Sequence, residues 1–107
     1  MTTFGIVFWD DTRDDGELNE EVANSVGKYV AVFIDLAAYY PQLSLRFTNV
    51  QISIACVVCA RKKYGIYPNC SERLWDLYAS QNIDREHVQQ AAVFLWEKYE
   101  KINHKRR

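Results

Sequence analysis

Residues 52–60, Ile-Ser-Ile-Ala-Cys-Val-Val-Cys-Ala, constrain the fold more than any other segment, because a helix built from them has no polar face. Just before them, Thr48 and Gln51 have the spacing of a capping box, in which each side chain binds the other residue's backbone N–H. Gly65, with Pro68 three residues later, marks the expected helix end. A helix without a polar face must be surrounded by others. The segment therefore predicts a buried helix at the centre of a helical bundle.

Amphipathic helices are predicted on both sides of this segment. The first spans about 17–40 and ends at Pro41, whose ring is incompatible with a helix interior. A short helix covers about 70–79, and the last begins after Asp84, a favourable N-cap. Asn69 and Ser71 are alternative caps for the short helix. The apolar positions recur at steps of three or four: Val22, Val26, Tyr29, Phe33, Ala37 and Tyr40; Leu74, Leu77 and Tyr78; and Val88, Ala91, Leu95, Tyr99 and Ile102.

Length and composition indicate one all-α domain. The chain has 107 residues, 49% hydrophobic and 25% charged, which is ordinary globular composition. We divide it into an N-terminal extension, residues 1–16, and a helical domain, residues 17–107. No apolar run approaches the ~20 residues that a membrane-spanning helix needs, and the first residues lack a secretory signal. We therefore expect an intracellular protein of the nucleus or cytoplasm, without membrane contact.

Charge is divided unevenly along the chain. Residues 1–45 hold eight acidic and two basic side chains, whereas residues 46–107 hold eleven basic and six acidic ones, and the net charge is −1. A near-neutral total argues against nucleic acid as the main partner, although the second half could form a basic face. We interpret the acidic residues between 10 and 21 as a solvated approach to the first helix.

The three cysteines carry the only candidate metal or nucleophilic chemistry. Cys56 and Cys59 form a C-x-x-C, which Cys70 and His87 could complete as a zinc site. However, the first two fall inside the apolar helix rather than in a turn, so small buried thiols describe them better. Cys70 with His87 or His104 would be a nucleophile pair without any local signature, and no phosphate loop, H-E-x-x-H or serine-triad motif is present. We expect no enzyme activity, cofactor or bound metal.

Several segments resemble the cyclin box. Residues 60–68 are similar to the A-S-K-F-E-E-I-Y-P that closes the central third cyclin helix, and residues 33–36 resemble the Y-I-D-R of the second. Leu45 and Arg46 resemble the L-R between those helices, and Gln51 the glutamine that opens the third. The resemblance covers residues 22–103 and implies helices two to five of a cyclin-like helical bundle, with one central apolar helix surrounded by amphipathic helices. The chain has no second repeat, and a single incomplete box leaves apolar surface that a second copy could cover.

The resemblance implies a non-catalytic protein-interaction domain, such as a regulatory subunit of a cyclin-dependent-type kinase or of a kinase-associated complex in cell-cycle control. Kinase-activating cyclins grip the kinase with a lysine at the end of the third helix and a glutamate in the fifth. The lysine position falls on Lys62, but the glutamate position falls near Ala92, where no glutamate stands. Glu86 and Glu97 lie about a turn or more away, so partner binding is implied more strongly than kinase activation.

The expected contact surface is the end of the central helix and the loop after it, residues 62–67, together with the nearby face of the first long helix. Tyr64 and Tyr67 in the loop should be partly exposed. The candidate partner-binding residues are Lys62, Lys63, Tyr64, Ile66 and Tyr67. One alternative is a nucleic-acid-binding cyclin-type repeat, as in general transcription factors, which would use Arg61, Lys62, Lys63 and the basic C-terminus. A second alternative is a zinc-stabilised interaction module.

Overall fold

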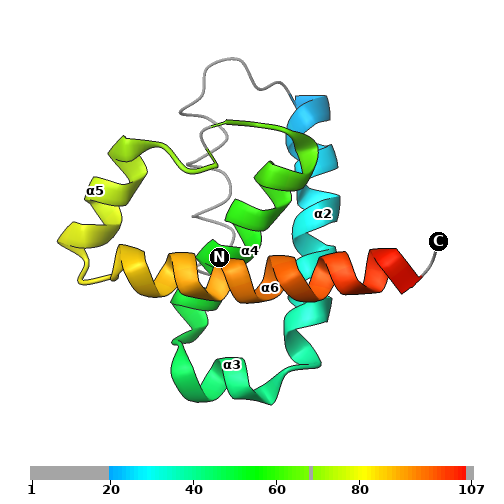
Figure 1. Cartoon of the computed structure of the whole chain (residues 1–107). Helices are drawn as coiled ribbons and strands as arrows, with labels where there is room; N and C mark the ends of the chain where they lie inside the picture. Colours follow the sequence, from blue (N-terminus) through cyan, green and yellow to red (C-terminus); the bar gives the residue numbers. More distant parts are fainter. Residues whose placement is uncertain (1–19, 68, 106–107) are drawn as a thin grey trace.

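The computed structural model describes residues 20–67 and 69–105, and this part of the chain is helical, with no strand (Figure 1). The all-α prediction is confirmed. The helices are α2 (Glu20–Ala38), α3 (Pro41–Arg46), α4 (Asn49–Tyr64), α5 (Glu72–Ser80) and α6 (Arg85–Lys105).

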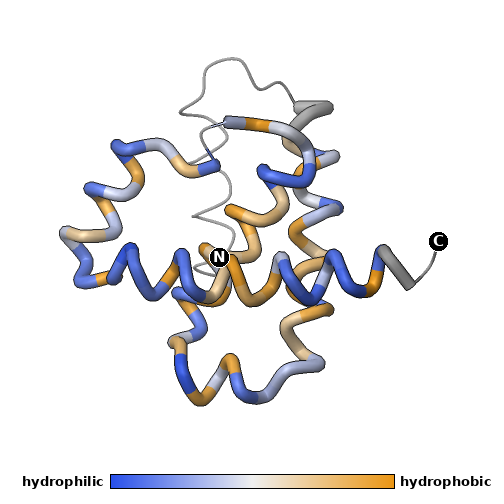
Figure 2. The backbone as a smooth tube through the Cα atoms, in the orientation of Figure 1, coloured by the Kyte–Doolittle hydropathy of each residue, from blue (hydrophilic) through white to orange (hydrophobic). Residues whose placement is uncertain are grey.

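Helix α4 is the centre of the packing. It packs against both α2 and α6, which also contact each other, and α6 crosses both of them (Figure 1). Hydrophobic residues gather along α4 where it meets α6 (Figure 2). The apolar side chains of α4 that are buried are Ile54, Ala55, Cys56, Val57, Cys59 and Ala60. The predicted central apolar helix is therefore present.

Local signals define both ends of α4, as predicted. Thr48 Oγ1 accepts a hydrogen bond from the Gln51 backbone N–H at 3.1 Å, and Gln51 Oε1 accepts one from the Thr48 N–H at 2.9 Å. At the other end, Gly65 has φ +95°, a left-handed conformation that side-chain-bearing residues rarely adopt. Its N–H donates to the carbonyls of Arg61 and Lys62. The orphan backbone groups of the helix are thus partly satisfied within the chain itself.

Aromatic rings join α2 to α6. The fully buried ring of Phe33 stacks on Trp96 with centroids 6.1 Å apart, and lies 4.9 Å from the centroid of Tyr99. Rings at this separation contribute beyond the area that they bury. This cluster fixes α6 across α2 and orients the part of α6 that follows Ala92.

The region around Pro41 differs from the prediction. Helix α2 ends at Ala38, and Pro41 opens the short helix α3, which was not predicted. Proline lacks only an N–H that the first helical turn leaves unsatisfied, and its fixed φ suits that position. Tyr40 is the N-cap of α3 rather than the end of α2, and Leu43 is the buried residue of α3.

The predicted buried faces were partly wrong. In α2 the buried positions are Ala23, Val26, Val30, Phe33 and Leu36, whereas Tyr29, Ala37 and Tyr40 are only half-buried. Leu77 and Ile102 are exposed, and Trp75 is buried instead. Ser71 rather than Asn69 caps α5, since its hydroxyl accepts from the Leu74 N–H at 3.3 Å. Asp84 precedes α6 and accepts from the Glu86 N–H, as expected for its N-cap.

Some predictions fall outside the described residues: the N-terminal extension, the helix start at 17–19, the side chain of Val22 and the end of the chain. Among the helices that are described, none has the length and apolar character needed to cross a bilayer.

Candidate functional site: a groove between α4, α5 and α6

A groove of about 710 Å³ lies where the second half of α4 faces α5 and α6. We call it the α4–α5–α6 groove. Its volume falls within the range of sites that bind ligands or partner side chains. The apolar residues that line it are Val58, Cys59, Trp75, Ala92, Val93 and Trp96. Val93 is 58% exposed although it is apolar, so the groove presents hydrophobic surface to solvent.

The position of α6 creates one wall of this groove. Val88, Ala91 and Leu95 face the core, as their spacing predicted. Val93 and Trp96 lie off that stripe, on a second face of α6 that borders the groove. Trp96 also packs on Phe33 of α2, so Val93 is the apolar residue of this second face that stays exposed.

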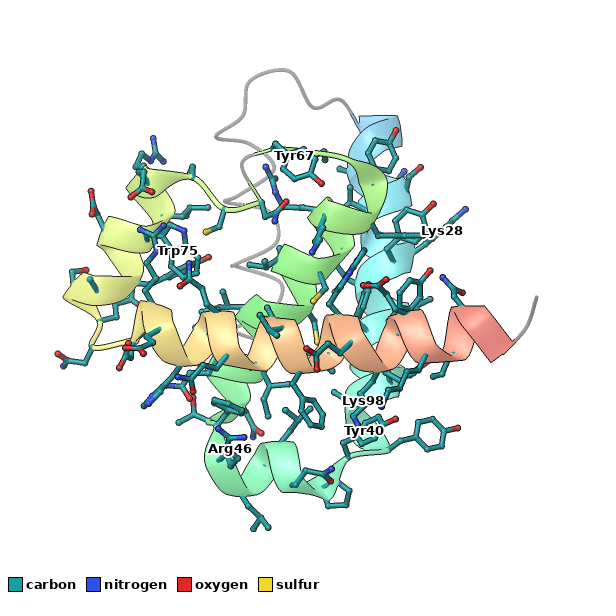
Figure 3. All side chains as sticks on the ribbon, in the orientation of Figure 1. Lys28, Tyr40, Arg46, Tyr67, Trp75 and Lys98 are labelled. Carbon is teal, nitrogen blue, oxygen red and sulfur yellow. The ribbon has the colours of Figure 1, made fainter. Side chains whose placement is uncertain are left out.

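Cations cover the two tryptophan rings of the groove. The Lys62 ammonium lies 4.4 Å from the centroid of Trp96, and the Arg85 guanidinium lies 4.8 Å from that of Trp75. Arg85 also donates to both carboxylate oxygens of Glu72, at 3.1 and 3.2 Å. These contacts tie α4 to α6 and the start of α6 to the start of α5. Figure 3 shows Trp75 between α5 and the rest of the bundle.

Two more carboxylates belong to the groove, Glu97 and Glu100 on α6. They stand one turn apart and therefore on the same side of the helix. Among the described residues, no cation forms an ion pair with either of them. The charges of the groove are thus of two kinds: those engaged with a ring or an ion-pair partner, and the open pair formed by Glu97 and Glu100.

The cysteines lie in the helical interior or beside the groove, and all three are buried. The Cys59 thiol donates to the Ala92 carbonyl at 3.3 Å. Burial raises the pKa of the Cys56 thiol to about 12. The pKa of the Cys59 thiol is also raised to about 12, mainly by burial and to a lesser extent by the neighbouring Cys56, whereas the positive charge of Lys62 lowers it. Such thiols stay protonated at neutral pH and are poor nucleophiles. The prediction of buried thiols is confirmed.

The zinc alternative gains no support from the geometry. The described residues contain no group of three or more His, Cys, Asp or Glu side chains placed to hold a metal ion. His87 lies beside Asp84, with Nδ1 3.7 Å from a carboxylate oxygen, and its ring faces Phe47. The nucleophile pairing of Cys70 with His87 likewise has no contact to support it in the described part of the chain.

The five candidate partner-binding residues lie at the end of α4 and in the loop after it. Of them only Lys62 lines the groove. The Lys63 ammonium lies 5.6 Å from the Tyr99 ring centroid, and the Tyr64 ring lies 6.4 Å from that of Tyr29. Ile66 is half-buried against the core, and Tyr67 is 70% exposed in the loop after α4 (Figure 3). The expected partial exposure of both tyrosines is confirmed.

Most residues of the groove were not predicted as binding residues from the sequence. Lys62 was, whereas Trp75, Arg85, Val93 and Glu100 were not. The available signal was on α6, where Val93 and Trp96 lie outside the core stripe at helical spacing. On α5, Trp75 stands three residues before Tyr78 and thus on the same side of the helix, but it was not among the apolar positions predicted there.

Comparison with known proteins found no matching family model and no significant match among curated proteins or solved structures. The likeness to cyclins therefore depends on the sequence segments described above.

Proposed function

We propose that the chain is a non-catalytic, cyclin-like protein-interaction domain that binds its partner in the α4–α5–α6 groove. The first class of partner to test is a protein kinase or a kinase-associated complex, as the sequence resemblance implies. The exposed apolar surface of the groove, together with its engaged cations, is the kind of surface that protein interfaces use.

One observation carries this proposal. The resemblance assigns the kinase-contacting lysine to Lys62, at the end of the central helix, and places the glutamate position near Ala92, on the last helix. These positions are far apart in the sequence, and both line the same groove. Their proximity at one site is the observation that favours this groove as the place where a partner binds.

Ala92 also limits the proposal. An alanine cannot accept a hydrogen bond through its side chain, so the two-residue grip of activating cyclins is incomplete here. We therefore propose docking of a partner, without proposing that a kinase is activated.

The nucleic-acid alternative receives less support from the same geometry. Arg61, one of the basic residues that it would use, is 0% exposed. The ammonium groups of Lys62 and Lys63 lie over aromatic rings of α6. Of the three cations at the end of α4, only Lys62 and Lys63 are therefore exposed for phosphate contacts.

The test is affinity purification from cells with the tagged chain and two lysine variants. Lys62→Ala removes the groove cation, and Lys28→Ala removes an exposed lysine of α2 as a matched control. We expect a protein kinase to co-purify with the wild type and the control, and to be depleted with Lys62→Ala. Absence of any kinase, or equal recovery with both variants, would overturn the proposal.

A further inference from the structure

We infer that the segment bound in the α4–α5–α6 groove is an amphipathic helix with an apolar face and with Lys or Arg on the flank that meets α6. This inference rests on the proposed function and adds to it the chemistry of the partner.

The dimensions of the groove indicate a helix of about three turns. Along α6 the groove extends from Gln89 to Glu100, which is about 17 Å at the rise of an α-helix. A partner helix of that length presents apolar residues at i, i+3, i+4 and i+7, the usual pattern of helix-in-groove recognition. An extended peptide fits less well, because its backbone polar groups would face apolar side chains and have no strand to pair with in the described part of the chain.

The charges of the groove determine the sign of the charge that the partner segment carries. Arg85 already binds Glu72 through two hydrogen bonds, and Lys62 lies over Trp96. The open charges are the carboxylates of Glu97 and Glu100, and no described cation pairs with them. A basic side chain placed there gains an ion pair, whereas an acidic one meets like charge and is rejected.

The apolar residues next to these carboxylates make the arrangement a recognition surface. Val93 stands one turn before Glu97 on α6, and Trp96 one turn before Glu100. An amphipathic helix lying along α6 would therefore set its apolar residues on the exposed Val93 and its basic residues against the carboxylates. The partner needs both features on adjoining faces of one helix.

The experiment is a selection of displayed 14-residue helical peptides against the purified chain, with the flanking positions randomised among Lys, Arg, Glu, Asp and Gln. Affinities of the enriched peptides are then measured by fluorescence anisotropy at low and at high salt. Val93→Gln tests the groove without changing its charge. Glu97→Gln with Glu100→Gln removes the open carboxylates, and Asp35→Asn with Asp76→Asn is the control of equal charge change at exposed positions outside the groove. Circular dichroism confirms that each variant is folded.

We expect enriched peptides to be basic on one flank and to bind less well at high salt. The Glu97 and Glu100 double variant should weaken them about three- to tenfold, as expected for two partly exposed ion pairs, while the Asp35 and Asp76 control changes little. Enrichment of acidic or neutral peptides that Val93→Gln abolishes would overturn the inferred chemistry and leave groove docking intact. Peptide affinities that Val93→Gln leaves unchanged would overturn the proposed function as well. Absence of any enriched peptide would overturn the helical partner, while kinase capture tests the proposed function separately.

Discussion

Replacing Ile54 by alanine tests whether α4 is the structural centre of the domain. The side chain of Ile54 is 1% exposed, and the substitution removes three carbon atoms from that environment. At about 0.8 kcal/mol for each buried carbon, the transfer term alone is about 2.4 kcal/mol. The cavity left behind adds to it, because the surrounding helices relax only partly. We expect a loss of about 3–4 kcal/mol in the free energy of unfolding.

Such a loss is large beside the ~5–15 kcal/mol by which domains are stable. The assay is urea denaturation followed by helical circular dichroism. Leu45→Ala is the matched control, since Leu45 is 86% exposed on α3, and its effect should stay within about 0.5 kcal/mol. The reasoning would be refuted if Ile54→Ala cost no more than the Leu45 control.

The remaining predictions concern the cap, the thiols and metal. Thr48→Ala removes the hydroxyl that accepts from the Gln51 N–H and should cost about 1 kcal/mol in urea denaturation; an effect below experimental error would contradict the observed capping box. The pKa values of the Cys56 and Cys59 thiols are raised from 9.0 to about 12. The contribution of the buried protonated thiols to the free energy of unfolding is therefore complete below about pH 9 and is lost as the pH rises toward 12. The urea midpoint should fall more steeply over this range than in the Cys56→Ala, Cys59→Ala variant, and equal slopes would count against the burial of the thiols. Excess chelator should leave the melting temperature unchanged, whereas a marked drop would revive the zinc-stabilised alternative.

Local signals were sufficient to predict α4 from the sequence. Its start depends on side chains three residues apart, Thr48 and Gln51, and its end on the left-handed conformation of Gly65. Each signal acts within one turn and needs no knowledge of the rest of the fold. The burial of the helix followed because nine consecutive positions offer no polar face.

Features that depend on distant contacts could not be predicted in the same way. Pro41 suits either the end of one helix or the first turn of the next, and the sequence alone does not distinguish these positions. The residues next to Arg61 in the sequence do not indicate that its side chain is buried. Nor do they indicate that the ammonium groups of Lys62 and Lys63 lie over aromatic rings of α6. The groove exists only because α4, α5 and α6 meet in space, so its lining residues have no common local pattern.

Site-specific photo-crosslinking tests the central claim, that a protein partner binds in the α4–α5–α6 groove, most directly. A photoreactive amino acid replaces Val93 in the groove or, as a control, Asp35 on the exposed face of α2. We predict a covalent adduct with a protein kinase, or with a kinase-associated protein, at position 93 and none at position 35. Adducts of that class at position 35 but not at position 93, or at neither position, would contradict the account.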